Sequence, residues 1–208
     1  HFTLNGPFGD VDKMNYNINV PGLYNVYNAS AAIIASMYGA YQLGKDAKLS
    51  KALRAYQGCK RRFEKIAEKN GILFYDDYAH HPTEIEAVLK AAKGWFPGKR
   101  IVVVFQPHTF SRTKALFTDF AKSFDNADMV GIADIFFSAR EEKDPEVSSE
   151  KLAEEIKKYH HDPEHVGYLG NLENAAKISK SVLKEGDVFI TLGAGDVYKI
   201  HNKILRST

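Results

Sequence analysis

Short apolar runs alternate with segments of helical periodicity from residue 72 onward. The runs are ILFY (72–75), IVVVF (101–105), MVGIA (129–133), VGYL (166–169) and VFITL (188–192). Each run is short and mostly β-branched or aromatic, which is typical of a buried strand. The pattern therefore predicts five strands in this part of the chain.

After each run, apolar residues recur every three or four positions, as on one face of a helix. The five faces are Ile85, Val88, Leu89 and Ala92; Leu116, Phe120 and Phe124; Leu152 and Ile156; Leu172, Ala175 and Leu183; and Val197, Ile200 and Ile204. Strand and helix thus alternate five times. This predicts a doubly wound, Rossmann-like α/β fold, in which a mostly parallel sheet is covered by helices on both faces.

Residues 1–58 have a different pattern. HFTLNGPFGDVDKMNYNINVPG is rich in Gly, Asn and Pro and predicts hairpins, while NASAAIIASMYGAYQL and KLSKALRAY predict two helices. We therefore expect two domains, 1–58 and 59–208. Because the chain opens on His1 rather than Met, and the first region is short and irregular, we expect a fragment whose first domain is incomplete.

Charge and cysteine content narrow the class of protein. The chain has 28 Lys and Arg against 26 Asp and Glu, so its net charge of +2 gives no basic surface for nucleic acid. A single cysteine, Cys59, excludes an internal disulfide and suits a reducing compartment. No apolar stretch has the length of a membrane span. We expect a cytoplasmic globular protein that binds neither nucleic acid nor a membrane.

The stretch DDYAHHPTE follows the first predicted strand and concentrates ionisable groups. Asp76, Asp77, His80 and His81 occupy six positions, and Pro82 suits the first turn of the helix that follows. Doubly wound sheets bind ligands beyond the carboxyl ends of their strands, and a helix start favours anions. Taken singly, the carboxylates have the simpler interpretation of turn caps, and the histidines that of hydrogen-bonded loop residues.

The stretch FQPHTFSRT follows the second predicted strand and reaches the same edge of the sheet. We expect Ser111 or Thr113 to cap the next helix, with Arg112 at its entry. A guanidinium there can hold a carboxylate or phosphate in two hydrogen bonds. His80, His108 and Arg112 are therefore predicted to hold a small anion or zwitterion.

Two further stretches have alternative interpretations. KRRFEKI (60–66) is either a solvated run of charge or a place from which Arg61 or Arg62 reaches phosphate groups. LGAGD (192–196) permits close backbone approach, but it lacks the third glycine of a dinucleotide fingerprint. The chain contains no G-x-x-x-x-G-K-[ST] phosphate loop.

A metal-dependent phosphoesterase is a competing interpretation of the Asp and His cluster, since both residue types bind Zn and Mn. A catalytic metal needs about three convergent ligands, and we find no second cluster with ligand spacing. YHHDPEH (159–165) is expected to be a solvated loop. We therefore predict no metal ligands in this chain.

Taken together, the motifs resemble the Mur ligases, ATP-dependent enzymes that add amino acids to the cell-wall precursor. The resemblance is carried by VPGLYNVYNASAAI (20–33), KRRFE, DDYAHHPTEI, FQPHTFSRT and LGAGD. It implies that residues 1–58 are the end of the central α/β ATPase domain and residues 59–208 the amino-acid-binding C-terminal domain. FQPHTFSRT is most similar to the members that join L-alanine to UDP-N-acetylmuramate, which would be the substrates.

The resemblance also implies nucleotide contacts. Asn25 and Asn28 would approach the adenine of ATP, Asp77 its ribose and Arg62 its phosphates. Tyr24 stands where the family usually has His, which alters the contact with adenine. The family's phosphate loop and most ligands of its Mg²⁺ would lie outside this chain.

The same resemblance assigns the amino-acid site. His80, His108 and Arg112 would hold the incoming alanine, with Tyr78 nearby. Without the phosphate loop, we predict that the isolated chain does not catalyse the ligation. The alternative is a stand-alone ligand-binding or regulatory module with the same fold.

Overall fold

The computed structural model describes residues 2–4, 14–42, 49–137, 142 and 144–206. The chain divides into two compact units, residues 1–59 and 60–208, and each is described by itself. Within the described residues, no helix is both long and apolar enough to cross a membrane.

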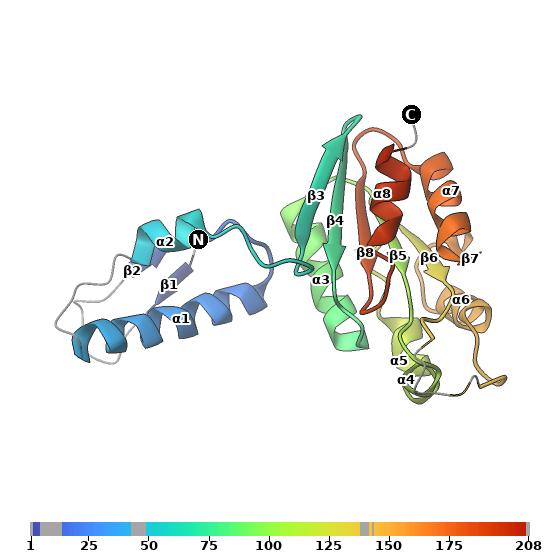
Figure 1. Ribbon diagram of the computed structural model, residues 1–208, viewed down its shortest axis with the longest axis horizontal. Coiled ribbons are helices and arrows are strands. Elements are labelled where there is room, and N and C mark those ends of the chain that lie inside the picture. The colour runs from blue at the N-terminus through green and yellow to red at the C-terminus, as the bar shows by residue number, and fades with distance from the viewer. Residues whose placement is uncertain (1, 5–13, 43–48, 138–141, 143, 207–208) are drawn as a thin grey trace. The chain divides into compact units, whose positions relative to one another are not determined.

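The second unit is built on a six-stranded sheet with the strand order β3-β4-β8-β5-β6-β7 (Figure 1). The strands are β3 (Glu64–Lys69), β4 (Ile72–Asp77), β5 (Ile101–Phe105), β6 (Met129–Ala133), β7 (Val166–Gly170) and β8 (Val188–Leu192). β3 pairs with β4 in antiparallel orientation, and all other neighbours pair in parallel. The five predicted strands and the mostly parallel α/β sheet are confirmed.

Helices cover both faces of this sheet, as predicted (Figure 1). They are α3 (Pro82–Trp95), α4 (Phe110–Ala115), α5 (Phe117–Lys122), α6 (Ser149–Lys157), α7 (Leu172–Val182) and α8 (Lys199–Arg206), with the 3₁₀ turn η1 (Pro163–His165) before β7. Residues of α3, α5 and α6 form one core with the sheet, and residues of α7 and α8 form another. The expected face from Leu116 to Phe124 crosses a helix break at Leu116.

The alternation of side chains along β5 shows why its sequence is apolar throughout. Ile101, Val103 and Phe105 join the core under α3, α5 and α6, whereas Val102 and Val104 join the core under α7 and α8. A strand buried on both faces has no solvent side, so it carries no polar alternation.

The edge strand β3 was not predicted, because EKIAEK reads as a run of charge. Its charged residues suit an unpaired edge, where they oppose association with another strand. A signal for the hairpin was nevertheless present in the sequence. Asn70 and Gly71 both have positive φ, as a two-residue hairpin turn requires, and they join residues 69 and 72, which are register partners.

The first unit contains β1 (Phe2–Leu4), β2 (Met14–Tyr16), α1 (Leu23–Gln42) and α2 (Leu49–Ala55). β1 and β2 pair in antiparallel orientation, as expected of a hairpin, while the connecting residues 5–13 lie outside the described residues. α1 begins five residues before the predicted start, directly after Gly22, whose φ is +96°. The Asn25 side chain donates a hydrogen bond to the Pro21 carbonyl at this helix start.

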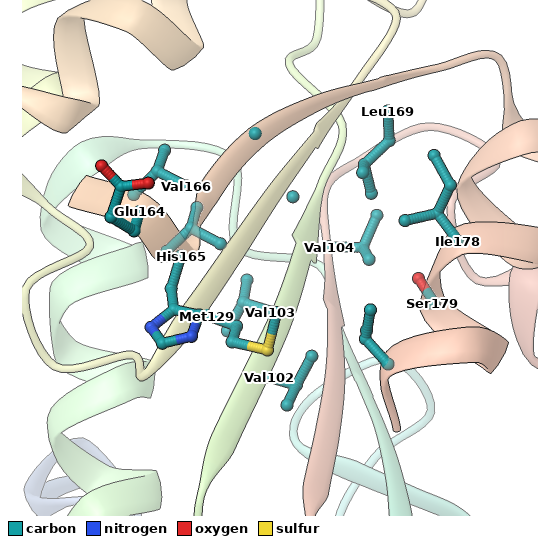
Figure 2. A pocket seen from close by; sticks show the side chains of 14 residues that line it. Val102, Val103, Val104, Met129, Glu164, His165, Val166, Leu169, Ile178 and Ser179 are labelled. Atoms are coloured by element: carbon teal, nitrogen blue, oxygen red, sulfur yellow. The ribbon is translucent and has the colours of Figure 1, made fainter. Parts of the chain in front are cut away.

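An apolar pocket of about 170 Å³ lies between α7 and the strands β5, β6 and β7 (Figure 2). Val102 and Val104 from β5 and Ile178 and Ser179 from α7 contribute to its lining (Figure 2). The residues that line it include none from the loops after β4, β5 and β8, so this pocket is separate from the loops that carry the candidate chemistry.

Candidate functional site

The loops after β5 and β6 are joined beyond the end of the sheet. His108 and Phe136 form an isolated parallel bridge, in which the Phe136 amide donates to the Pro107 carbonyl and the Thr109 amide donates to the Phe136 carbonyl. The His108 ring stacks on the Phe136 ring, with centroids 5.1 Å apart and planes inclined by 11°. The position of His108 is thus fixed by both its backbone and its ring.

The two adjacent histidines of the loop after β4 have different roles. His81 caps α3: its Nδ1 accepts a hydrogen bond from the Thr83 amide, and the Glu84 carboxylate accepts one from the His81 amide. Pro82 stands in the first turn, as predicted. His80 lies before the cap, with its Nδ1 3.0 Å from the Tyr78 carbonyl oxygen. Since that carbonyl can only accept, Nδ1 carries a proton, and in the neutral ring the lone pair is on Nε2.

Four aromatic rings form a row along the carboxyl edge of the sheet, and we call this set the ring row: Tyr78, His80, His108 and Phe136. Successive centroids lie 5.2, 6.4 and 5.1 Å apart. The guanidinium carbons of Arg61 and Arg62 lie 5.0 and 5.8 Å from the centroid of the Tyr78 ring. The structure thereby brings together three of the expected site residues, Arg62, His80 and His108.

Asp76 and Asp77 are the last two residues of β4, and both are buried. The Asp77 oxygens accept hydrogen bonds from the Phe63 and Ala79 amides, each at 2.7 Å. Burial raises the pKa of Asp77 to about 6, against the lowering effect of these two amides. The turn-capping interpretation therefore describes Asp77 well. Each oxygen retains a second lone pair, so the ribose contact expected of Asp77 stays a prediction.

Arg112 lies within α4 and is partly exposed, and its expected contact with the amino acid stays a prediction. The prediction that Ser111 or Thr113 caps this helix was wrong. The helix begins at Phe110, so both residues lie inside it, and the Thr113 hydroxyl donates to the Thr109 carbonyl instead.

The glycine loop after β8 runs between the loops of β4 and β5, because β8 lies between these strands. A Cβ on Gly193 would come 2.7 Å from the Gln106 carbonyl oxygen, and one on Gly195 would come 2.6 Å from the Gln106 Oε1 and the Phe136 ring. The predicted close approach of backbone at LGAGD is confirmed. A larger residue at position 193 or 195 would therefore displace Gln106 or Phe136, and Phe136 is part of the ring row.

Asn25 and Asn28 lie on α1 in the first unit. There they line a pocket of about 400 Å³ together with apolar residues of α1 and α2. The Asn28 side chain is exposed. Their expected contact with adenine stays a prediction.

The stretch 159–165 is largely exposed, as expected of a solvated loop, but His160 within it is buried. The His160 Nε2 lies 3.0 Å from the Ala127 carbonyl oxygen, and its Nδ1 lies 2.9 Å from that of Asp162. Among the described residues, no three His, Cys, Asp or Glu side chains converge as metal ligands.

Sequence reasoning missed a buried polar chain behind the ring row. Thr191 of β8 and His201 of α8 connect to Asp76, which pairs with Arg61. Thr191 stands in an apolar run and His201 on a helix, so neither had a local signal of function.

Comparison with known proteins assigns the chain to a family. A model described as "Mur ligase, glutamate ligase domain" matches residues 61–195, which include the ring row and the glycine loop. The chain belongs to the Mur ligase family. This Mur ligase chain is 42% identical over 205 residues to the UDP-N-acetylmuramate–L-alanine ligase of Treponema pallidum, and 46% identical over 191 residues to that of Roseiflexus.

Solved structures agree with this assignment. The crystal structure of UDP-N-acetylmuramate–alanine ligase from Thermotoga maritima matches 94% of the chain with a TM-score of 0.75 at 28% identity. A murein peptide ligase from Psychrobacter arcticus matches 91% with a TM-score of 0.60, also at 28% identity. This Mur ligase chain spans 41% of the length of its Treponema relative, 39% of the Roseiflexus relative, and 40% and 38% of the two solved chains.

Proposed function

We propose that this chain is the amino-acid-binding part of an ATP-dependent ligase that joins L-alanine to UDP-N-acetylmuramate. The observation that carries the proposal is the approach of His80 and His108, whose ring centroids lie 6.4 Å apart although their loops follow strands separated by β8. The relatives named for this reaction support the choice of substrates.

The proposed reaction assigns a role to His80, His108 and Arg112. The amine of alanine attacks the carbonyl carbon of an acyl phosphate, so that the C–N bond forms, the C–O bond to phosphate breaks and the amine loses a proton. His80 presents the lone pair of its Nε2, which can accept that proton. His108 and Arg112 hold the carboxylate of the amino acid, and this fixed position makes the attack effectively intramolecular.

The cationic groups serve the phosphate end of the site. Arg62 binds phosphate oxygens and stabilises negative charge that develops on the reacting carbonyl. ATP supplies the phosphoryl group when bound, with Asn25 and Asn28 toward its adenine and Asp77 toward its ribose. The Mg²⁺ ligands are expected mainly outside this chain.

The placement of the ionisable side chains also argues against the phosphoesterase alternative. A catalytic metal needs about three convergent ligands. Within the described residues, no three His, Cys, Asp or Glu side chains converge in this way. The cytoplasmic location inferred from the sequence stays a prediction.

Titration of the 208-residue chain with L-alanine, followed by NMR, tests the proposal. Signals of His80 and His108 should shift, and His80→Ala and His108→Ala should each weaken binding about tenfold or more, as expected for a lost charge-assisted hydrogen bond. His165→Ala is the matched control, since His165 is an exposed histidine in η1. Equal affinity in all three variants would refute the assignment.

A second assay concerns the whole reaction. We expect no phosphate release when the isolated chain is mixed with ATP, L-alanine and UDP-N-acetylmuramate. Release that depends on all three substrates, from highly purified protein, would contradict the expectation that the phosphate loop lies outside this chain.

A further inference from the structure

A chain of buried polar groups runs from α8 to the edge of the sheet. His201 Nε2 lies 2.8 Å from the Thr191 hydroxyl oxygen, and that hydroxyl lies 2.6 Å from Asp76 Oδ1. Asp76 Oδ2 accepts a hydrogen bond from Arg61 Nε at 3.0 Å. The Asp76, Thr191 and His201 side chains are essentially inaccessible to solvent, whereas the Arg61 side chain is 23% exposed.

The donors and acceptors of this chain allow one arrangement. An ionised carboxylate only accepts, so the single proton of the Thr191 hydroxyl goes to Asp76. His201 must then donate its Nε2 proton to Thr191. The rings of Phe74 and Phe189 lie edge-on to His201, with centroids 6.0 and 5.5 Å away, and hold it in place.

Arg61 is held at the outer end of the chain by several contacts. Its Nη2 donates to the Gly193 carbonyl at 2.6 Å, and its guanidinium carbon lies 5.0 Å from the Tyr78 ring centroid and 4.7 Å from that of Tyr198. Its backbone has a φ of +56°, a conformation that costs free energy in a residue other than glycine. The Glu64 carboxylate accepts a hydrogen bond from the Arg61 backbone amide, and this bond offsets the cost.

These contacts connect Arg61 to two parts of the candidate site. Tyr78 is the first ring of the ring row and contacts His80. Gly193 opens the glycine loop that packs against Gln106. A guanidinium that is fixed by a buried carboxylate therefore fixes the Tyr78 ring and the loop together.

We propose that the buried chain His201–Thr191–Asp76 makes Arg61 a positioning residue, which sets the placement of Tyr78 and His80 in the ring row. The inference rests on the proposed function only in its consequence for ligand binding. Burial is consistent with it, because removal of one donor leaves a buried Asp76 oxygen unsatisfied, and this cost is relieved when the carboxylate shifts from the position in which it holds Arg61.

Thr191→Val tests the proposal at the middle of the chain. It removes the hydroxyl at nearly constant volume and leaves both ends intact, while Thr191→Ser restores the hydroxyl. Ser123→Ala is the matched control: it removes a buried hydroxyl that donates to the Phe120 carbonyl after α5, outside the polar chain. All variants are made in the 208-residue chain.

NMR of the side chains gives the first readout. We expect Thr191→Val to speed exchange of the Arg61 Nε proton with water and to shift the Tyr78 and His80 ring signals, and Thr191→Ser to return them to the wild-type positions. Ser123→Ala should leave them unchanged. Tyr78 and His80 signals that stay in place in Thr191→Val would overturn the inference.

Binding of L-alanine gives the second readout and separates the two proposals. Thr191→Val should weaken binding about tenfold relative to wild type and Ser123→Ala. If the wild-type chain binds no L-alanine, the proposed function fails, while the ring signals still decide the inference. If wild type and Thr191→Val bind equally, the inference fails and the proposed function stands.

A second variant covers the case in which Thr191→Val does not fold. Arg61→Lys keeps the charge at a partly exposed position but loses the fork that bridges Asp76 and Gly193. It should shift the Tyr78 and His80 signals in the same direction. Unchanged signals in folded Arg61→Lys would overturn the inference.

Discussion

Gly131 of β6 and Gly167 of β7 are register partners, yet only one of them has room for a side chain. A Cβ on Gly131 would lie 2.2 Å from Leu169 Cδ1 and 2.9 Å from its Cγ, whereas a Cβ on Gly167 would meet nothing within 4 Å. Both residues line the apolar pocket under α7. Leu169 therefore excludes a side chain at position 131, whereas no neighbouring atom excludes one at position 167.

Gly131→Ala should lower the free energy of unfolding by about 1–3 kcal/mol, because Leu169 must leave its position in a packed layer. Gly167→Ala should be neutral or raise it by about 0.4–1 kcal/mol, since alanine restricts the unfolded chain and the site is open. Urea unfolding of the two variants measures both. Equal effects would show that Leu169 adjusts without cost.

Arg100 and Asp187 pair at the amino edge of the sheet, away from the candidate site. Arg100 Nε and Nη2 bind the two Asp187 oxygens at 2.9 and 2.6 Å, and Asp187 is buried. Arg100→Lys cannot form both bonds, so we expect a loss of about 1–3 kcal/mol in the free energy of unfolding. Arg54→Lys, on the exposed surface of α2, is the matched control and should stay within about 0.5 kcal/mol of wild type. A similar value for both variants would contradict the prediction.

Asp77→Asn should destabilise the chain, because an amide offers one acceptor oxygen where the carboxylate offers two. The Phe63 or the Ala79 amide then loses its partner in a buried place, at a cost of about 1–3 kcal/mol. Asp119→Asn on the exposed side of α5 is the control and should change the free energy of unfolding by less than about 0.5 kcal/mol. An Asp77→Asn protein as stable as wild type would show that these amides find other partners.

Asp77 and His201 should have opposite effects on stability as pH changes. Burial lowers the pKa of His201 to about 4, so between pH 6.5 and 4 the unfolded chain binds a proton there that the folded chain does not. Stability from this group falls as pH falls. Burial raises the pKa of Asp77 to about 6, so between pH 6 and 3.8 the folded chain binds the extra proton. Stability from that group rises as pH falls.

Asp77→Asn removes the titration of Asp77, so the pH dependence of stability that comes from His201 should become visible. Wild type should show partial cancellation, whereas Asp77→Asn should lose up to about 3 kcal/mol more than wild type between pH 6 and pH 4. Urea unfolding at the two pH values measures the difference, and the ¹H NMR titration of His201 should have a midpoint near 4. Parallel pH profiles for wild type and Asp77→Asn would refute the raised pKa of Asp77.

Local sequence determined the elements of the fold because burial imposes periodicity on them. The apolar runs such as IVVVF marked every parallel strand, and the helical faces such as Ile85, Val88, Leu89 and Ala92 were buried as expected. Hydrophobic periodicity failed for β3, since an exposed edge strand is under no pressure to be apolar. It also missed the break at Leu116, where apolar spacing continues across two short helices.

The motif loops were placed at one edge of the sheet by the sequence, since a parallel sheet gathers the carboxyl ends of its strands. Strand order was decided only by the tertiary structure: β8 lies between β4 and β5, yet the loops after β4 and β5 bring the His80 and His108 ring centroids within 6.4 Å. The chain from His201 to Arg61 depends on contacts between residues up to 115 positions apart. Such contacts leave no periodic trace, because each is set by one three-dimensional juxtaposition and not by repetition along the chain.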